Sequence, residues 1–226
     1  MTKLARWALQ HLDYRFAKTD LLEIALTHKS SGPNNNERLE FLGDAVLGCV
    51  IAEALYVQES DADEGTLSRM RALLVRRETL AELATEIAVG DQLNLGAGET
   101  RSGGHHRNSI LADALEAIIG AAFLDGGFAV AQAIVMRLYA ERLADLPAPD
   151  SLKDPKTLLQ ERLQAESLAV PEYAVTSASG PDHNRRFIVE CHIPDRRILT
   201  RGRGISRRRA EQAAAAAALS ALIGES

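Results

Sequence analysis

Apolar residues recur every three or four positions through most of the first 147 residues of the chain. This spacing predicts amphipathic helices, because residues three and four positions apart lie on one face of a helix. No alternating pattern typical of a strand precedes Pro147, so this part of the chain is predicted to be all-α. The clearest helical segments are LLEIALTH, LEFLGDAVLGCVIAEALY, LSRMRALLVRRETLAELATEIA, SILADALEAIIGAAFLDGG and AVAQAIVMRLYAERLADL.

The periodicity changes after the proline-rich segment LPAPDSLKDP, and residues 146–153 are predicted to be a linker. A helix is expected from Asp154, which can cap it, and Pro155, which suits a first turn. EYAVTSASG, RRFIVECHI and RRILTRGRG are predicted to be strands, and SRRRAEQAAAAAALSALI a helix whose alanines allow close packing on the sheet. The order α-β-β-β-α predicts an α+β domain with both helices on one face of its sheet.

Two domains are therefore predicted, an all-α domain over residues 1–147 and an α+β domain over residues 148–226. The 226 residues, 46% hydrophobic and 25% charged, have room for both. The sequence has no secretion signal and no apolar run of the roughly 20 residues that span a membrane, so a cytoplasmic protein is expected. We expect Cys49 and Cys191 to be buried, reduced thiols.

The net charge of −5 is unevenly distributed along the chain. Residues 1–147 carry a net charge of −7, whereas residues 148–226 carry +2. Residues 196–209 contain seven arginines and no acid. The acidic first domain suits a metal ion, and the locally basic second domain suits a polyanion.

Acids interrupt two otherwise apolar helices of the first domain. At about 100° per residue, Glu37, Glu40 and Asp44 lie within roughly 60° of one another around their helix. Asp113 and Glu116 are three residues apart and therefore share one face of theirs. If the two helices face each other, these carboxylates form a cage of hard oxygen ligands, which Mg²⁺ and Mn²⁺ prefer.

Two other interpretations of these acids are open. They could form structural salt bridges with Arg38, Arg69 or Arg71, which is the simpler interpretation for a single pair of acids. A di-iron carboxylate bundle is the other, but it normally uses a Glu-x-x-His motif, and neither acidic helix has a histidine at that spacing. Two acid pairs inside apolar helices favour the Mg²⁺ or Mn²⁺ site, because buried carboxylates need a cation or water beside them.

The segment ERLEFLGDAVL, residues 37–47, resembles the signature of the ribonuclease III family at every position. Three further segments are similar to motifs of that family in the same order: LTHKS (26–30), DEGTLSRMRALLV (63–75) and ADALEAIIGAAFLDGG (112–127). The resemblance covers essentially the whole chain, because bacterial members have a helical endonuclease domain followed by one double-stranded RNA-binding domain.

The resemblance implies roles for individual acids. Asp44 and Glu116 match catalytic residues of the family. The metal-binding acids of the family match Glu40, Asp44, Asp113 and Glu116. Auxiliary acids near the scissile strand match Glu37 and Glu64.

Phe41 matches the dimer residue of the family, a hydrophobic knob that enters a socket on the partner subunit. From the residues alone, plain core packing is the simpler interpretation of Phe41.

The resemblance also implies RNA contacts in the second domain. They match Thr157, Gln160 and Glu161 in the first helix, His183 in a turn between strands, and Arg207 and Arg208 at the start of the last helix. Polar side chains suit the 2′-hydroxyls of the minor groove of duplex RNA, and arginines at a helix N-terminus suit phosphates. A solvated polar stripe, an ordinary loop histidine and a solvated basic helix end are the alternatives. The family usually has lysines where Arg207 and Arg208 stand, and arginine binds as a planar fork.

The implied function is cleavage of double-stranded RNA by a homodimer that depends on Mg²⁺, for which Mn²⁺ can substitute. The implied products are staggered ends with 5′-phosphate and 3′-hydroxyl groups, and the implied substrates are precursors of ribosomal RNA together with messenger and transfer RNAs. The alternative is a non-catalytic double-stranded RNA-binding dimer with a degenerate nuclease domain. Such a copy is expected to lack one of the four metal-binding acids, and all four are present.

Overall fold

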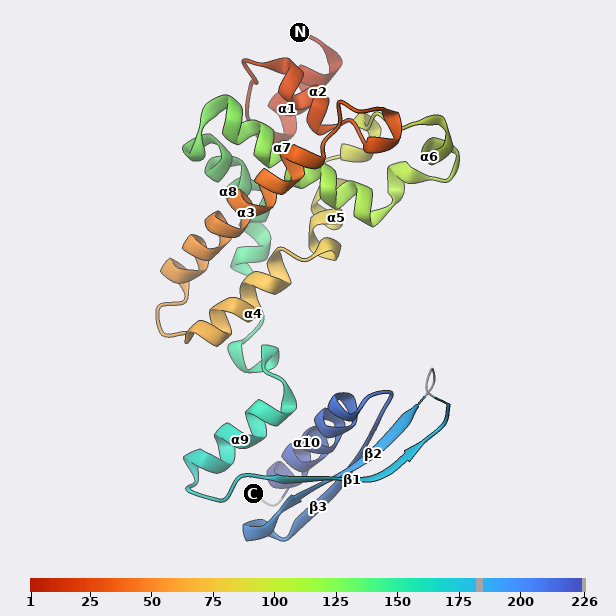
Figure 1. Cartoon of the computed structure of the whole chain (residues 1–226). Coiled ribbons are helices and arrows are strands. Elements are labelled where there is room, and N and C mark those ends of the chain that lie inside the picture. The colour runs from red at the N-terminus through yellow and green to blue at the C-terminus, as the bar shows by residue number, and fades with distance from the viewer. Residues whose placement is uncertain (182–184, 225–226) are drawn as a thin grey trace. The chain divides into compact units, whose positions relative to one another are not determined.

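The computed structural model describes residues 1–181 and 185–224 (Figure 1). It divides into two compact units, Met1–Pro147 and Ala148–Ser226. His183, an expected RNA contact, lies outside the described residues. No helix of the described part of the chain is both long enough and apolar enough to cross a membrane.

The first unit is helical, as the spacing of apolar residues predicts. Short 3-10 turns and an isolated bridge between Thr27 and Asn94 complete its regular structure in the described residues. Its helices are α1 (Lys3–Leu12), α2 (Thr19–Ala25), α3 (Glu37–Gln58), α4 (Glu64–Leu74), α5 (Arg77–Glu86), α6 (Ala97–Arg101), α7 (Asn108–Gly126) and α8 (Phe128–Ala144).

The helical pattern expected from Leu67 to Ala88 is interrupted in the structure, where α4 ends and α5 begins. Arg76 has an extended backbone conformation, and the Thr79 hydroxyl donates a hydrogen bond to the Leu73 carbonyl at 2.9 Å. The Thr79 side chain thus satisfies a carbonyl that the end of α4 leaves without a helical partner. This break has no proline or glycine, which is why the pattern of apolar residues does not reveal it.

Helix α7 is the centre of the first unit, and α3 crosses it (Figure 1). Apolar side chains are buried around nearly the whole of α7, so other helices surround it. A Cβ atom on Gly43 of α3 would overlap the backbone carbonyl oxygen of Glu116, and one on Gly120 of α7 would overlap that of Leu39. Glycines at this crossing therefore allow the two backbones to touch.

The outer face of α3 differs from the buried helix that its apolar sequence indicates. Phe41 is 81% exposed and Tyr56 is 74% exposed, so plain core packing is wrong for Phe41 within one protomer. Cys49 lies on the exposed surface of the same helix, and the expectation of a buried thiol is wrong for this residue, whereas Cys191 is buried. The reason is that α7 covers only one side of α3.

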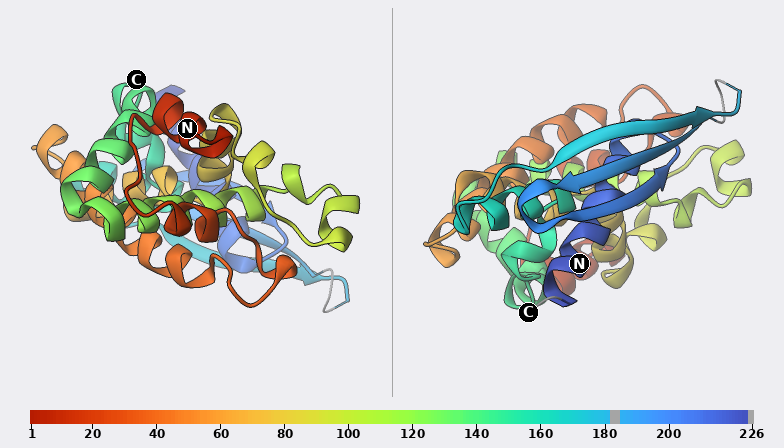
Figure 2. Two further views of the ribbon diagram at one scale, coloured as in Figure 1. Left: turned by 90° about the horizontal axis from the view of Figure 1, so that it is seen from above. Right: turned by 90° about the horizontal axis from the view of Figure 1, so that it is seen from below.

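The second unit is an α+β domain, as predicted. A 3-10 turn, Pro149–Leu152, precedes α9 (Pro155–Ala165). Strands β1 (Glu172–Ser179), β2 (Arg186–Ile193) and β3 (Ile198–Gly204) form an antiparallel sheet in that order, and α10 (Arg207–Gly224) follows (Figure 2).

Both helices of the second unit pack on one face of the sheet. Leu159 and Leu163 of α9 share a buried cluster with Cys191 and Ile193 of β2 and with alanines of α10. A Cβ atom on Gly202 of β3 would overlap the backbone of α10. The alanines and this glycine therefore let α10 lie directly on β3, as expected from the alanine-rich sequence.

Candidate active site

Three carboxylates from two helices meet where α3 crosses α7. Glu40 comes from the first turn of α3, and Asp113 and Glu116 come from adjacent turns of α7. One oxygen of each lies within 4.8 Å of the others, and all three side chains are only partly exposed. The close approach of the backbones at Gly43 and Gly120 explains the meeting, because Gly43 lies about one turn from Glu40 and Gly120 about one turn from Glu116.

No arginine of the described residues forms an ion pair with these acids, although the charge of Arg77 lowers the pKa of both Asp113 and Glu116 against the larger effect of burial. Among the described residues, no ion pair is formed by Glu40, Asp44, Asp113 or Glu116. Arg69, one of the cations considered for a structural salt bridge, instead donates a hydrogen bond to the Thr66 hydroxyl at 3.0 Å. The salt-bridge interpretation of the acids therefore has no support in the geometry.

The electrostatics of the cluster reflect crowded negative charge. Burial, followed by the charges of Asp44, Glu40 and Asp113, raises the pKa of Glu116 to about 8. Burial and the charge of Asp113 raise the pKa of Glu40, and burial raises the pKa of Asp113. Carboxylates whose pKa values rise together in this way favour binding a proton or a cation.

The chemistry of the donor set fits a hard divalent cation. All three side chains offer carboxylate oxygens, and no histidine or cysteine belongs to this group among the described residues. Oxygen ligands of this kind suit Mg²⁺ and Mn²⁺, whereas structural zinc sites use mainly cysteine and histidine. Three of the four acids predicted to bind a metal thus lie close together, and Asp44 is not one of them.

Other predicted acids lie beside this group. Asp44 is exposed one turn after Glu40 and is not one of the three closest carboxylates, although its charge raises the pKa of Glu116. Glu37 forms an ion pair with Lys29 at 3.2 Å. Glu64 begins α4 and accepts a hydrogen bond from Ser68 at 2.8 Å.

The pattern of residues alone indicated no role for Lys29, although the LTHKS segment contains it. Its charge lowers the pKa of both Glu40 and Asp113, against the larger effect of burial. The position of Lys29 in a motif shared with a nuclease family is the signal that could have identified it. The glycines of the helix crossing are a second group that sequence analysis did not interpret.

Phe41 lies beside a groove on the same unit. The groove has a volume of about 700 Å³, and its apolar lining includes Leu21, Ile24, Leu42 and Leu124. An exposed aromatic ring next to an apolar groove is typical of a surface that another protein covers.

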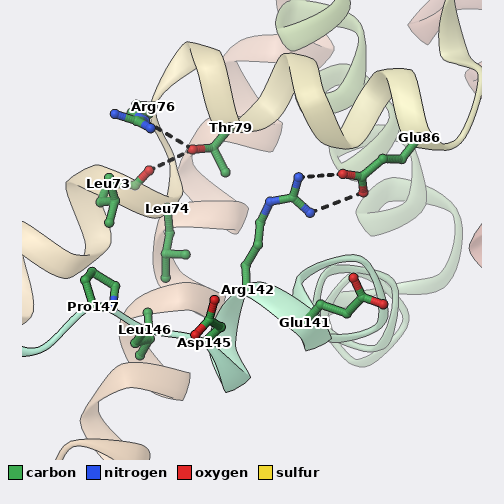
Figure 3. Close-up of a pocket in the computed structure, with 10 residues that line it drawn as sticks. All are labelled: Leu73, Leu74, Arg76, Thr79, Glu86, Glu141, Arg142, Asp145, Leu146 and Pro147. Atoms are coloured by element: carbon green, nitrogen blue, oxygen red, sulfur yellow. Dashed lines mark hydrogen bonds and ion pairs between the residues drawn. The ribbon is translucent and has the colours of Figure 1, made fainter.

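A separate cavity of about 400 Å³ lies where α4, α5 and α8 end or begin (Figure 3). In Figure 3, Arg142 reaches across to Glu86, with nitrogen–oxygen distances of 2.7 and 3.2 Å. None of the clustered acids lines this cavity.

The predicted RNA contacts of the second unit are accessible where the structure describes them. Gln160, Glu161, Arg207 and Arg208 are exposed, and Thr157 is partly exposed. Glu161 pairs with Lys153 at 2.6 Å, and Arg207 pairs with Glu211 at 2.8 Å. The Arg207–Glu211 pair joins residues four positions apart on α10, but the Lys156–Glu211 pair depends on how α9 and α10 pack and could not be read from the sequence.

Comparisons with known proteins agree with this arrangement. Residues 18–143 match a family model described as ribonuclease-III-like, and residues 155–222 match the double-stranded RNA binding motif. Ribonuclease 3 of Thiobacillus denitrificans is 54% identical over 206 residues, which are 91% of each chain. Ribonuclease 3 of Vibrio vulnificus is 52% identical over 94% of this chain and 95% of its own.

A solved structure also matches the first unit of this chain. The nuclease domain of ribonuclease III from Campylobacter jejuni, whose structure concerns a region involved in dimer formation, is 44% identical to this chain. The match has a TM-score of 0.60 and covers 62% of this chain and 98% of that domain. With matching models for both units and relatives more than half identical over nearly their whole length, this chain belongs to the ribonuclease III family.

Proposed function

We propose that this protein is an endoribonuclease that cleaves double-stranded RNA with the help of a divalent cation, Mg²⁺ or in its place Mn²⁺. The observation that carries the proposal is the meeting of Glu40, Asp113 and Glu116 within 4.8 Å without an arginine partner among the described residues. The family and the double-stranded RNA binding motif supply the substrate class.

The three clustered carboxylates would hold the cation, and Asp44 would join them from the next turn of α3. A divalent cation in such a site makes water a better nucleophile near neutral pH and stabilises negative charge on phosphate oxygens. Burial and the neighbouring acids raise the pKa of Glu116 to about 8, and a cation bound beside it would favour its charged form. Glu37 and Glu64 would act as auxiliary acids near the scissile strand.

The second unit would bring the duplex to these acids. Thr157, Gln160 and Glu161 offer hydrogen-bonding groups to 2′-hydroxyls, and Arg207 and Arg208 offer positive charge to phosphates. Cleavage would leave 5′-phosphate and 3′-hydroxyl ends. Precursors of ribosomal RNA, with messenger and transfer RNAs, are the proposed substrates, and the cytoplasm is the proposed location.

A homodimer would place one acid cluster in each protomer. Phe41, 81% exposed beside an apolar groove, is the proposed knob, and the groove of the second copy is its proposed socket. Two sites that each cut one strand would produce the staggered ends. The relative whose nuclease domain forms a dimer supports this proposal.

The proposal is tested by incubating the protein with a long RNA duplex and with a single-stranded RNA of the same composition. With Mg²⁺ present, the duplex should be cut to short products with 5′-phosphate and 3′-hydroxyl termini, and a chelator should stop the reaction. Tight binding of the duplex without any cutting in Mg²⁺ or Mn²⁺ would instead favour the non-catalytic RNA-binding dimer.

A further inference from the structure

Glu211 is a buried carboxylate in a domain whose proposed partner is a polyanion. The residue is 8% exposed and lies in the second turn of α10. Its oxygens have different partners, since Oε2 lies 2.6 Å from Nζ of Lys156 and Oε1 lies 2.8 Å from Nε of Arg207. One acid thus joins a cation from α9 to a cation from α10.

The two cations stand at the starts of the helices that carry the proposed RNA contacts. Lys156 is in the first turn of α9, where Asp154 caps the helix through the backbone N–H groups of Lys156 and Thr157. Its ammonium group also lies 4.4 Å from the centre of the Tyr173 ring. Lys156 is therefore held in place from two sides, and Glu211 fixes the start of α10 to it.

Arg207 is held by one edge of its guanidinium group. The Nε atom donates to Glu211, whereas 66% of the Arg207 side chain is exposed. Because a guanidinium is planar, fixing Nε also fixes the direction in which its terminal amino groups point. Glu211 thus orients the part of Arg207 that a phosphate could reach.

We infer that Glu211 is a positioning residue for duplex RNA binding, which sets the spacing between the α9 contacts and Arg207 and aims the guanidinium of Arg207 outward. The inference rests on the proposed RNA-binding function of the second unit. The hydrogen bonds support it electrostatically, because they hold the pKa of Glu211 below its usual value although burial alone would raise it.

The net charge of the domain alone predicts the opposite effect of replacing Glu211 on duplex affinity. A carboxylate close to a polyanion repels it, so neutral glutamine at position 211 should tighten binding if net charge alone mattered. A positioning role predicts weaker binding from the same substitution. The sign of the change in affinity therefore separates the two explanations.

The experiment measures binding of the full chain to a duplex RNA of about 30 base pairs, long enough for a domain that spans about 16, in a chelating buffer across a range of salt concentrations. Glu211→Gln is compared with Glu190→Gln, which makes the same change at the Glu190–Arg201 pair (2.7 Å) between β2 and β3. Glu190→Gln should leave affinity within about twofold of wild type, because its partner Arg201 is 71% exposed and is not one of the proposed RNA contacts.

Glu211→Gln should weaken binding about tenfold, the equivalent of one lost charge-assisted hydrogen bond. It should also lower the slope of log affinity against log salt by about one, as expected for one lost phosphate contact. A merely structural role would lower the folded fraction seen by circular dichroism and leave the slope unchanged. Glu211→Asp keeps the charge but is too short to reach both cations, so it should weaken binding without a charge change.

Unchanged or tighter binding by Glu211→Gln, or a loss of affinity with an unchanged salt slope, would overturn the inference. If Glu211→Gln fails to fold, wild-type affinity in Glu211→Asp would overturn it. Failure of the wild-type chain to bind the duplex would overturn the proposed RNA-binding function itself, which is a distinguishable result.

Discussion

Glu116 of the first unit and Glu211 of the second are both largely removed from water on a helix, yet their environments are opposite. Glu211 has Lys156 and Arg207 within hydrogen-bonding distance, and its pKa is lowered. Glu116 has other acids as its neighbours, and its pKa is raised to about 8. A buried carboxylate that the chain itself neutralises organises structure, whereas one that the chain leaves among like charges favours a cation from outside.

The largest expected effect is that of replacing the Glu116 carboxyl group, which forms no ion pair in the described residues. Glu116→Gln should lower the cleavage rate of duplex RNA at least about 100-fold, the scale on which loss of a group that stabilises reacting charge acts. Duplex binding should be retained, because the proposed RNA contacts named above lie in the other unit. Single-turnover cleavage and binding in a chelating buffer measure the two quantities.

Glu141→Gln is the matched control, since Glu141 is an acid of the same unit that lines the cavity of Figure 3 and not the acid cluster. It should cleave like wild type. If Glu116→Gln cuts at the wild-type rate in Mg²⁺, Glu116 has no part in the mechanism. The proposed difference in role between Glu116 and Glu211 would then be wrong.

The crossing of α3 and α7, which brings the acids together, should be disrupted by a single added methyl group. Gly43→Ala should lower the free energy of unfolding by about 1–3 kcal/mol or more, because the new methyl group overlaps the backbone of α7. Gly48→Ala, on the same helix with open space at its Cβ position, should instead stabilise the helix by about 0.5–1 kcal/mol. Urea unfolding at equal protein concentration measures both, and equal effects of the two substitutions would contradict the described crossing.

The pH dependence of stability is a smaller effect with a definite sign. Between about pH 4.5 and about 8, the folded chain keeps a proton on Glu116 that the unfolded chain releases, so stability without a divalent cation falls as pH rises through this window. Mg²⁺ replaces the proton, so it should raise the melting temperature by about 2–4 °C more at the upper end of the window than at the lower. Thermal scans with Mg²⁺ and with a chelator test this, and equal Mg²⁺ effects at both ends would count against it.

The sequence predicted the components of the site better than their final arrangement. The spacing of Glu40, Asp113 and Glu116 on apolar helices predicted carboxylates that could meet, because helical periodicity is a local property. The spacing could not show that Asp44 stands apart from the closest three, because the crossing at Gly43 and Gly120 decides which turns face each other.

Features that depend on distant parts of the chain were beyond the pattern of residues. The Lys156–Glu211 pair joins residues in different helices, and the exposure of Cys49 depends on which side of α3 its neighbours cover. The role expected for Phe41 came from resemblance to the ribonuclease III family, since the apolar pattern alone favoured a buried ring. The two-domain order followed from local signals, namely the prolines near residue 150 and the change from helical to alternating periodicity.

The most direct test of the central claim is to measure the binding of Mn²⁺ by electron paramagnetic resonance, without RNA, in wild type, Glu116→Gln and Glu141→Gln. If Glu40, Asp113 and Glu116 hold a divalent cation, Glu116→Gln should bind Mn²⁺ at least about tenfold more weakly than the other two proteins, because one charged ligand is lost. Equal Mn²⁺ affinity in all three proteins would contradict the account.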